Sequence, residues 1–353
     1  LLSLVSKQFE NGLLPHMIYW IPSEKLKIKW GKADTSTITQ PPIIADAVLK
    51  IYQSDSDVEF LRSIYPNLKN YYKYLLTERD ARKNHIVSII NPDESGEDNS
   101  PRFDLQLHLL PVHKISQNFK QRLKLVQENL ECDFDAPRCM KNFFWTKDVP
   151  FNAILVKNLK SMSKLAHTLN FSKDTKYFEN QVKLISKAMR KFMFEDGMYF
   201  SLYEESYQKI KVKTWAIFSP LYAKLYTYDE AIALVKNHLL NRSEFWPNFP
   251  VPTVAINEPS FDPKGFWRGP TWIVTNWLIF QGLINYGFFD IAEKIYNVSR
   301  NLVEKQGFRE YFNPLSGQGL GAKNFTWGAL VLDMEKTLNS LNNKYKLLRS
   351  TSK

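Results

Sequence analysis

The chain has 353 residues, of which 44% are hydrophobic, so it is long enough for one large domain or two ordinary ones and apolar enough to bury a sizeable core. Its net charge of +11 comes from basic residues scattered along the sequence without the interleaved aromatics of a nucleic-acid module. We therefore expect a solvated lysine-rich surface, no nucleic-acid partner and only a weak attraction for anionic ligands. No run of eighteen apolar residues occurs, which predicts that no segment spans a membrane.

The two cysteines, Cys132 and Cys139, flank a proline-containing loop. Such sparse cysteine usage is typical of a reducing compartment, so we expect both thiols to stay reduced and the protein to be cytoplasmic. The sequence opens at Leu1 with neither Met nor a charged leader, which predicts the interior of a longer chain rather than a signal peptide.

Apolar residues recur at helical spacing through most of the chain. The predicted helices cover residues 41–54, 57–82, 115–130, 150–169, 173–195, 213–225, 228–240, 270–286, 289–305 and 325–346. Convincing strands are few, and one short hairpin is predicted from residues 198–203 and 210–213. About ten helices with little sheet predict a toroid of paired helices whose functional loops gather at one end.

Two acidic motifs interrupt this helical pattern about two hundred residues apart. The first runs from Glu94 to Asp104 and the second from Gly307 to Trp327. Each places a carboxylate in a loop-like stretch crowded with glycine, asparagine, arginine and aromatic residues. Two carboxylates held apart across an aromatic pocket are what glycoside hydrolysis requires.

Each carboxylate also has a structural interpretation. Asp98 lies in a sequence that is typical of a turn, and Glu310 could be a surface residue paired with Arg309. Arg102 is expected to hold the first motif through Asp104. The two carboxylates occur in one chain, each in the motif described above and in the order that the resemblance described below implies. This joint occurrence favours a catalytic role for both.

The motifs resemble those of glycoside hydrolase family 63, and the resemblance covers nearly the whole chain. The stretches that carry it are Gly12-Leu13-Leu14-Pro15-His16, Thr39-Gln40-Pro41-Pro42, Ser95-Gly96-Glu97-Asp98-Asn99-Ser100-Pro101-Arg102, Asp148-Val149-Pro150-Phe151-Asn152-Ala153, Phe266-Trp267-Arg268-Gly269-Pro270-Thr271-Trp272, Glu310-Tyr311-Phe312-Asn313-Pro314 with Gly317 and Gly321, and Phe325-Thr326-Trp327. The length and simplicity of the chain look closest to the mannosylglycerate and glucosylglycerate hydrolases of that family.

The resemblance implies an all-α fold, the (α/α)6 barrel of six helical hairpins, and hydrolysis of an α-glycosidic bond with inversion. It implies one catalytic domain over residues 1–353 that lacks its first helices, since such a barrel needs twelve. By the same resemblance Asp98 is the general acid and Glu310 the general base. The sequence departs from the family at Asp93 and Glu97, which place further carboxylates beside Asp98 and would raise its pKa.

Several further residues are candidates for binding the sugar. Trp267 can stack on a pyranose face and Arg268 can donate paired hydrogen bonds, although both could instead support the catalytic loop from the interior. Other pocket candidates, each with a place in the core as its alternative, are Gln40, Trp215, Trp272, Tyr311 and Trp327. The histidines show no metal-ligand spacing and no phosphate-binding glycine loop occurs, so we expect neither a metal nor a cofactor, with water as the second substrate.

The predicted function is therefore that of an inverting α-glycosidase acting on a small α-glycoside such as mannosylglycerate or glucosylglycerate. The net positive charge favours an anionic aglycone. One alternative is an exo-α-glucosidase or a trehalase-like enzyme acting on oligosaccharides. The other is a barrel that binds carbohydrate without catalysis.

Overall fold

The computed structural model describes the backbone of residues 1–351 and the side chains of residues 1–341. The chain folds into two compact units, Leu1–Lys211 and Val212–Lys353. Both are built mainly from helices with short antiparallel ribbons, which confirms the predicted mostly helical fold. Closure of the helices into a barrel and a single domain over 1–353 stay predictions. Within the described residues, no helix combines the length and apolar character that a membrane crossing requires.

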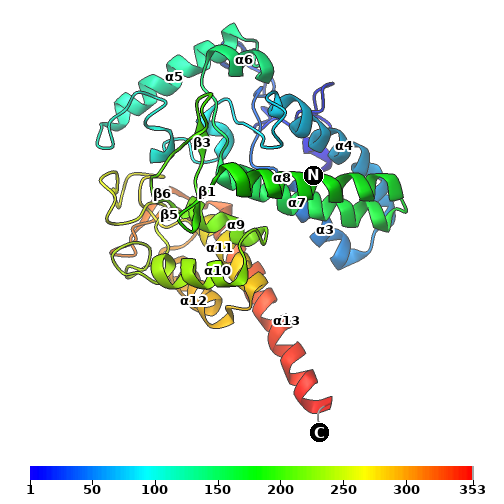
Figure 1. Ribbon diagram of the computed structural model, residues 1–353, viewed down its shortest axis with the longest axis vertical. Helices are drawn as coiled ribbons and strands as arrows, with labels where there is room; N and C mark the ends of the chain where they lie inside the picture. The colour runs from blue at the N-terminus through cyan, green and yellow to red at the C-terminus, as the bar shows by residue number, and fades with distance from the viewer. Residues whose placement is uncertain (352–353) are drawn as a thin grey trace. The chain divides into compact units, whose positions relative to one another are not determined.

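The first unit contains a helical hairpin, α7 and α8, whose helices lie side by side in Figure 1. The helices α3 and α4 both pack against α7. The helices of this unit are α1 (Leu2–Val5), α2 (Glu24–Trp30), α3 (Ile44–Asp55), α4 (Val58–Thr77), α5 (Ile115–Glu131), α6 (Ala136–Asn142), α7 (Val149–Thr168) and α8 (Ser172–Phe192), with 3-10 turns η1 (Glu78–Asp80), η2 (Pro92–Ser95) and η3 (Pro101–Phe103).

Helix α4 illustrates how the sequence pattern becomes packing. Asp57 caps its first turn by accepting the amide hydrogen of Phe60 at 2.9 Å, and the apolar face predicted from the sequence is buried. The helix ends at Thr77, five residues earlier than predicted. The Asp80 carboxylate accepts the amides of Asn84 and His85, so the chain turns there instead of continuing the helix.

The second unit is organised around α11, a largely buried helix that packs against α9, α12 and α13. A capping box between Thr227 and Glu230 starts α10, within the helix predicted over residues 228–240. The elements of this unit are η4 (Trp215–Phe218), α9 (Ser219–Tyr222), α10 (Tyr228–Leu234) with a π-helical continuation η5 (Val235–Leu239), α11 (Ile273–Tyr286), α12 (Phe289–Gln306), η6 (Thr326–Ala329) and α13 (Leu330–Thr351).

The strands differ from the predicted hairpin. Strand β2 (Met198–Tyr199) pairs back with β1 (Phe194–Glu195), because Asp196 and Gly197 adopt left-handed backbone angles that close a tight turn. Strand β3 (Leu202–Tyr203) pairs separately with β4 (Gln208–Lys209). In the second unit, β5 (Arg309–Phe312) and β6 (Gly319–Lys323) form a hairpin where the sequence predicted a loop.

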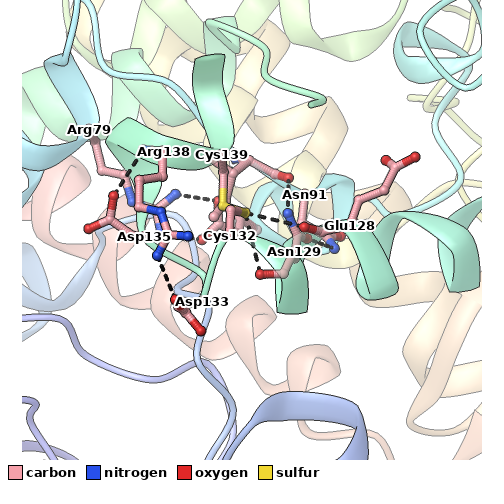
Figure 2. The surroundings of a disulfide bond; sticks show 11 residues. Arg79, Asn91, Glu128, Asn129, Cys132, Asp133, Asp135, Arg138 and Cys139 are labelled. Carbon is pink, nitrogen blue, oxygen red and sulfur yellow. Dashed lines mark hydrogen bonds and ion pairs between the residues drawn. A yellow bond between two sulfur atoms is a disulfide. The ribbon is translucent and has the colours of Figure 1, made fainter. Parts of the chain in front are cut away.

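The prediction of two free thiols is wrong, because Cys132 and Cys139 form a disulfide (Figure 2). Cys132 ends α5, and the short helix α6, which the sequence analysis missed, turns the chain back so that the two Cα atoms lie 5.3 Å apart. Disulfides persist mainly in oxidising compartments, so the cytoplasmic location stays a prediction that has lost the support of free cysteines.

Candidate active site

In the first unit, the acid loop is the segment 91–104 that carries Asp98. Asn91 opens it by accepting the amide hydrogen of Asp93 at 3.0 Å, which caps the turn η2. Gly96 ends that turn with a φ of 75°, a conformation that glycine adopts without strain. Pro101 then starts η3, so Asp98 lies in the bend between two short helical turns.

A buried ion pair anchors the first half of the acid loop. Arg79 and Glu94 are 1% and 0% exposed and form two parallel contacts of 2.6 Å. The Glu94 carboxylate also accepts the amides of Thr39 at 3.1 Å and Ile90 at 2.9 Å. Both oxygens of the fully buried Glu94 carboxylate are engaged by these groups, so Glu94 ties the acid loop to Arg79 and to two backbone amides.

A second buried arginine anchors the other half. Arg102 contacts both oxygens of Glu97, at 2.9 and 3.1 Å, and Asp148 at 3.1 Å. Arg102 thus contacts Glu97 and Asp148, two partners that the sequence analysis did not name, and its contact with Asp104 stays a prediction. Glu97 and Glu94 are both engaged by arginines, and the other carboxylates of the loop are Asp93, Asp98 and the buried Asp104.

Asp98 is held by a residue that the sequence analysis missed. Arg122 of α5 contacts Asp98 at 2.6 Å with Nη1 and also contacts Asp93. Burial raises the pKa of Asp98 to about 6, while the charge of Arg122 lowers it and that of Asp93 raises it. The neighbouring carboxylate Asp93 contributes to this shift as expected, and burial is the larger cause. No motif marks Arg122, because it is one of many basic residues on a polar helix.

Gln40 lies directly against the acid loop. Its Nε2 donates to the carbonyl of Asp93 at 2.8 Å, and a Cβ added to Gly96 would lie 3.2 Å from its Oε1. Gln40 thus supports the loop next to Asp98. The cavity of about 480 Å³ in this unit is lined by other residues, from the 105–108 segment, α5 and Trp145.

In the second unit, Glu310 lies on strand β5, and this corrects the predicted loop. Its Oε2 accepts the amide hydrogen of Ala322 on β6 at 2.9 Å. Gly321 makes this possible, since a Cβ there would lie 2.8 Å from the Glu310 Cβ and 2.5 Å from a ring carbon of Tyr311. Arg309, the partner in the structural interpretation of Glu310, donates Nη2 to the Gly321 carbonyl at 3.0 Å.

Four of the predicted aromatic residues meet in one cluster. The rings of Trp267 and Trp272 stack with centroids 3.7 Å apart, and Trp272 stacks on Tyr311 at 4.9 Å. Trp327 lies 6.2 Å from Trp267 and 5.6 Å from Trp272. Trp272 is 1% exposed and donates its indole hydrogen to the Phe266 carbonyl. This fits a place in the core, the alternative to direct sugar binding that the sequence analysis gave for this residue. Burial raises the pKa of Tyr311, and the nearby Glu310 adds to the shift.

The last two sugar-binding candidates, Arg268 and Trp215, lie near Thr253. The Thr253 hydroxyl accepts the amide hydrogen of Gly269, which follows the buried Arg268, and the Thr253 carbonyl accepts the amide hydrogen of Trp215 at 3.0 Å. The indole Nε1 of Trp215 is buried without a hydrogen-bond partner among the described residues. A donor in this state is satisfied when a bound water or sugar hydroxyl accepts from it.

The described residues contain no cluster of acidic, histidine or cysteine side chains that could hold a metal ion.

Comparison with known proteins identifies this chain as a glycoside hydrolase. A family model described as the mannosylglycerate hydrolase MGH1-like glycoside hydrolase domain matches residues 1–328, and the chain belongs to that family, within glycoside hydrolase family 63. The family expected from the sequence is therefore confirmed.

Individual relatives agree with this assignment. The chain is 31% identical to the mannosylglycerate hydrolase of Thermus thermophilus over 92% of this chain and 85% of that protein. It is 25% identical to the glucosylglycerate hydrolase of Mycolicibacterium hassiacum over 94% of this chain and 85% of that protein. A crystal structure of a mannosylglycerate hydrolase from Thermus thermophilus in complex with Tris and D-glycerate superposes with a TM-score of 0.85 at 30% identity, covering 95% of this chain and 87% of that chain.

Proposed function

We propose that this glycoside hydrolase cleaves a small α-glycoside of glycerate, such as mannosylglycerate or glucosylglycerate, with inversion at the anomeric carbon. The similarity to hydrolases of both compounds supports this substrate class. The observation that carries the proposal is the state of Asp98, whose pKa burial raises to about 6 in a loop anchored by two buried arginines. A carboxyl group of that kind is protonated in about half of the molecules at pH 6 and in a minor fraction at pH 7, and the protonated form can donate its proton.

In the proposed reaction Asp98 donates its proton to the glycosidic oxygen as the bond to the anomeric carbon breaks. Glu310 takes a proton from a water molecule, whose oxygen forms the new bond on the opposite face of the sugar. Inverting enzymes hold their two carboxyl groups roughly 6.5–9.5 Å apart to leave room for this water. Oε2 of Glu310 accepts the Ala322 amide, which leaves Oε1 to receive the proton of the water.

Arg122 supports the choice of an anionic aglycone. In a glyceric acid glycoside the carboxylate is bonded to the carbon that carries the glycosidic oxygen, so a cation must lie next to the general acid. Arg122 contacts Asp98, and its buried Nε has no hydrogen-bond partner among the described residues. We propose that this guanidinium binds the glycerate carboxylate, as guanidinium groups commonly do with a paired geometry.

The proposal also covers the residues expected to bind the sugar and the fold that carries them. Stacked aromatic rings and a buried arginine suit the apolar face and the hydroxyl groups of a pyranose. We propose that the paired helices of this chain belong to an (α/α)6 barrel and that residues 1–353 lie in one catalytic domain. The sugar-binding residues of this proposal are Gln40, Trp215, Trp267, Arg268, Tyr311 and Trp327, and Trp272 supports them by stacking on Trp267 and Tyr311.

The test is hydrolysis of mannosylglycerate, glucosylglycerate, trehalose and kojibiose by the purified protein, with the anomer formed first read by proton NMR. We expect turnover of a glycerate glycoside and initial release of the β-anomer. Activity on trehalose and kojibiose alone would contradict the glycerate substrate, and initial release of the α-anomer would contradict inversion.

Two variants test the assigned carboxylates. Asp98→Asn and Glu310→Gln should bind the glycoside yet lose turnover by about 10²–10⁴-fold, the usual contribution of an acid or base. If the wild-type protein and both variants bind sugar but are equally inactive, the chain is a carbohydrate-binding barrel and the enzyme mechanism is wrong.

A further inference from the structure

Helix α5 contacts the acid loop at two points. Arg122 reaches Asp98 and Asp93 in the middle of the loop. About two turns further along α5, Asn129 reaches the root of the loop, where its Oδ1 accepts from Asn91 Nδ2 at 2.9 Å and its Nδ2 donates to the Ile90 carbonyl at 3.3 Å. The orientation of α5 therefore determines both where the loop begins and which cation meets its carboxylate.

Asn129 is a fully buried side chain with a specific partner. It is 0% exposed and Asn91 is 1% exposed, so water does not compete for their hydrogen bond. Asn91 in turn accepts the Asp93 amide and so caps the turn that precedes Asp98. A displacement at Asn129 is thus passed to the acid loop through two consecutive hydrogen bonds.

The disulfide fixes the end of α5 that carries Asn129 (Figure 2). Cys132 follows Asn129 by three residues, and both cysteines pack in one buried cluster with Ile90. The turn that they enclose includes Asp133 and Phe134, with φ values of 55° and 52°. Two successive non-glycine residues in the left-handed region are unfavourable, so contacts must hold this turn. The crosslink is one of them, together with the packing of Phe134 against Trp30.

We propose that Asn129, held in place by the Cys132–Cys139 disulfide, is a positioning residue for the loop that carries Asp98. The inference rests on the proposed function, since it assigns the loop a catalytic proton donor. When the crosslink is intact, α5 keeps the start of the loop buried and the Asp98 carboxyl in its partly buried arrangement, 24% exposed. When the bond is reduced, or the Asn129 amide is removed, the loop loosens and more water reaches the carboxyl.

The experiment compares Asn129→Ala with Asn118→Ala. Asn118 is a matched control because it is also a buried asparagine of α5, 2% exposed, and its Nδ2 has no hydrogen-bond partner among the described residues. The pKa of Asp98 is read by carbon NMR titration of aspartate-labelled protein, and kcat and KM are measured on a glycerate glycoside.

In Asn129→Ala we expect the pKa of Asp98 to move down from about 6 toward the ordinary value of 3.8, because the carboxyl becomes hydrated. We expect kcat to fall about 10- to 100-fold with little change in KM. Asn118→Ala should change neither quantity. If both variants keep the wild-type titration and kcat, Asn129 has no positioning role.

The role of the crosslink is tested with the double variant Cys132→Ala/Cys139→Ala and with wild-type protein reduced under native conditions, each checked for folding by circular dichroism. Both should shift the Asp98 titration in the same direction as Asn129→Ala, and an unchanged titration in both would overturn the role of the disulfide. The titration needs no turnover, so a wild-type protein that hydrolyses no glycoside would refute the proposed function while leaving this inference separately testable.

Discussion

Gly321 offers a sharp test of the arrangement around Glu310. Its φ of 65° lies in the left-handed region, and its missing side chain leaves the space in which the Glu310 carboxylate accepts the Ala322 amide. Replacing it with alanine places a methyl group 2.8 Å from the Glu310 Cβ and 2.5 Å from the Tyr311 ring. These distances are shorter than contacts between real atoms, so Glu310 must move.

The cost has two parts. A non-glycine residue in the left-handed region costs about 1–2 kcal/mol. Loss of the charged hydrogen bond between Glu310 and Ala322 adds about 1.5–3 kcal/mol. We therefore expect Gly321→Ala to lower the free energy of unfolding by about 2.5–5 kcal/mol. Since a displaced base cannot reach its water, we also expect it to lower kcat by about 100-fold.

Gly287→Ala is the matched control, because Gly287 also lies in the second unit with a φ of 78° but has nothing within 4 Å of an added Cβ. It should show only the backbone cost and keep the wild-type kcat. Urea unfolding and steady-state kinetics measure both quantities. The reasoning is refuted if Gly321→Ala and Gly287→Ala lose the same stability and retain the same kcat.

Three further predictions concern charged groups of the first unit. Arg122→Met removes a positive charge that lowers the pKa of Asp98. The alkaline limb of the pH profile of kcat/KM, where the acid loses its proton, should therefore move to higher pH. An unchanged limb would argue against this coupling between Arg122 and Asp98. Burial lowers the pKa of Lys147 from 10.5 to about 8, so between these two pH values the unfolded protein keeps a proton that the folded protein has lost. The free energy of unfolding should therefore rise by up to about 3 kcal/mol as the pH increases over that range. Urea unfolding of Lys147→Met at the same pH values should show no such rise. Arg79→Met leaves Glu94 buried without its partner and should cost about 3–5 kcal/mol in thermal or urea unfolding, whereas a near-neutral result would show that solvent reaches this carboxylate.

Local signals predict much of the helical architecture. The apolar positions of α4, the capping residues of α10 and the hairpin of α7 and α8 are all consequences of spacing along the chain, and their predicted helices lie close to the observed bounds. The short helix α6 is not predicted because seven residues are too few to show a period, and without it the disulfide is not predicted either. Strand β5, which carries Glu310, is not predicted, because its partner β6 is rich in glycine and lacks the alternation of apolar and polar residues that indicates a strand.

Residue identity and order were enough to establish the family, the helical class and the two motifs that contain Asp98 and Glu310. The folded arrangement was needed to establish that Arg122 contacts Asp98, that Glu94 and Glu97 are engaged by Arg79 and Arg102, and that Cys132 is crosslinked. Each of these contacts joins side chains whose approach depends on how the backbone turns between them. The pKa of a carboxyl depends on burial and on charges within a few ångströms, and these are properties of the fold that spacing along the chain does not encode.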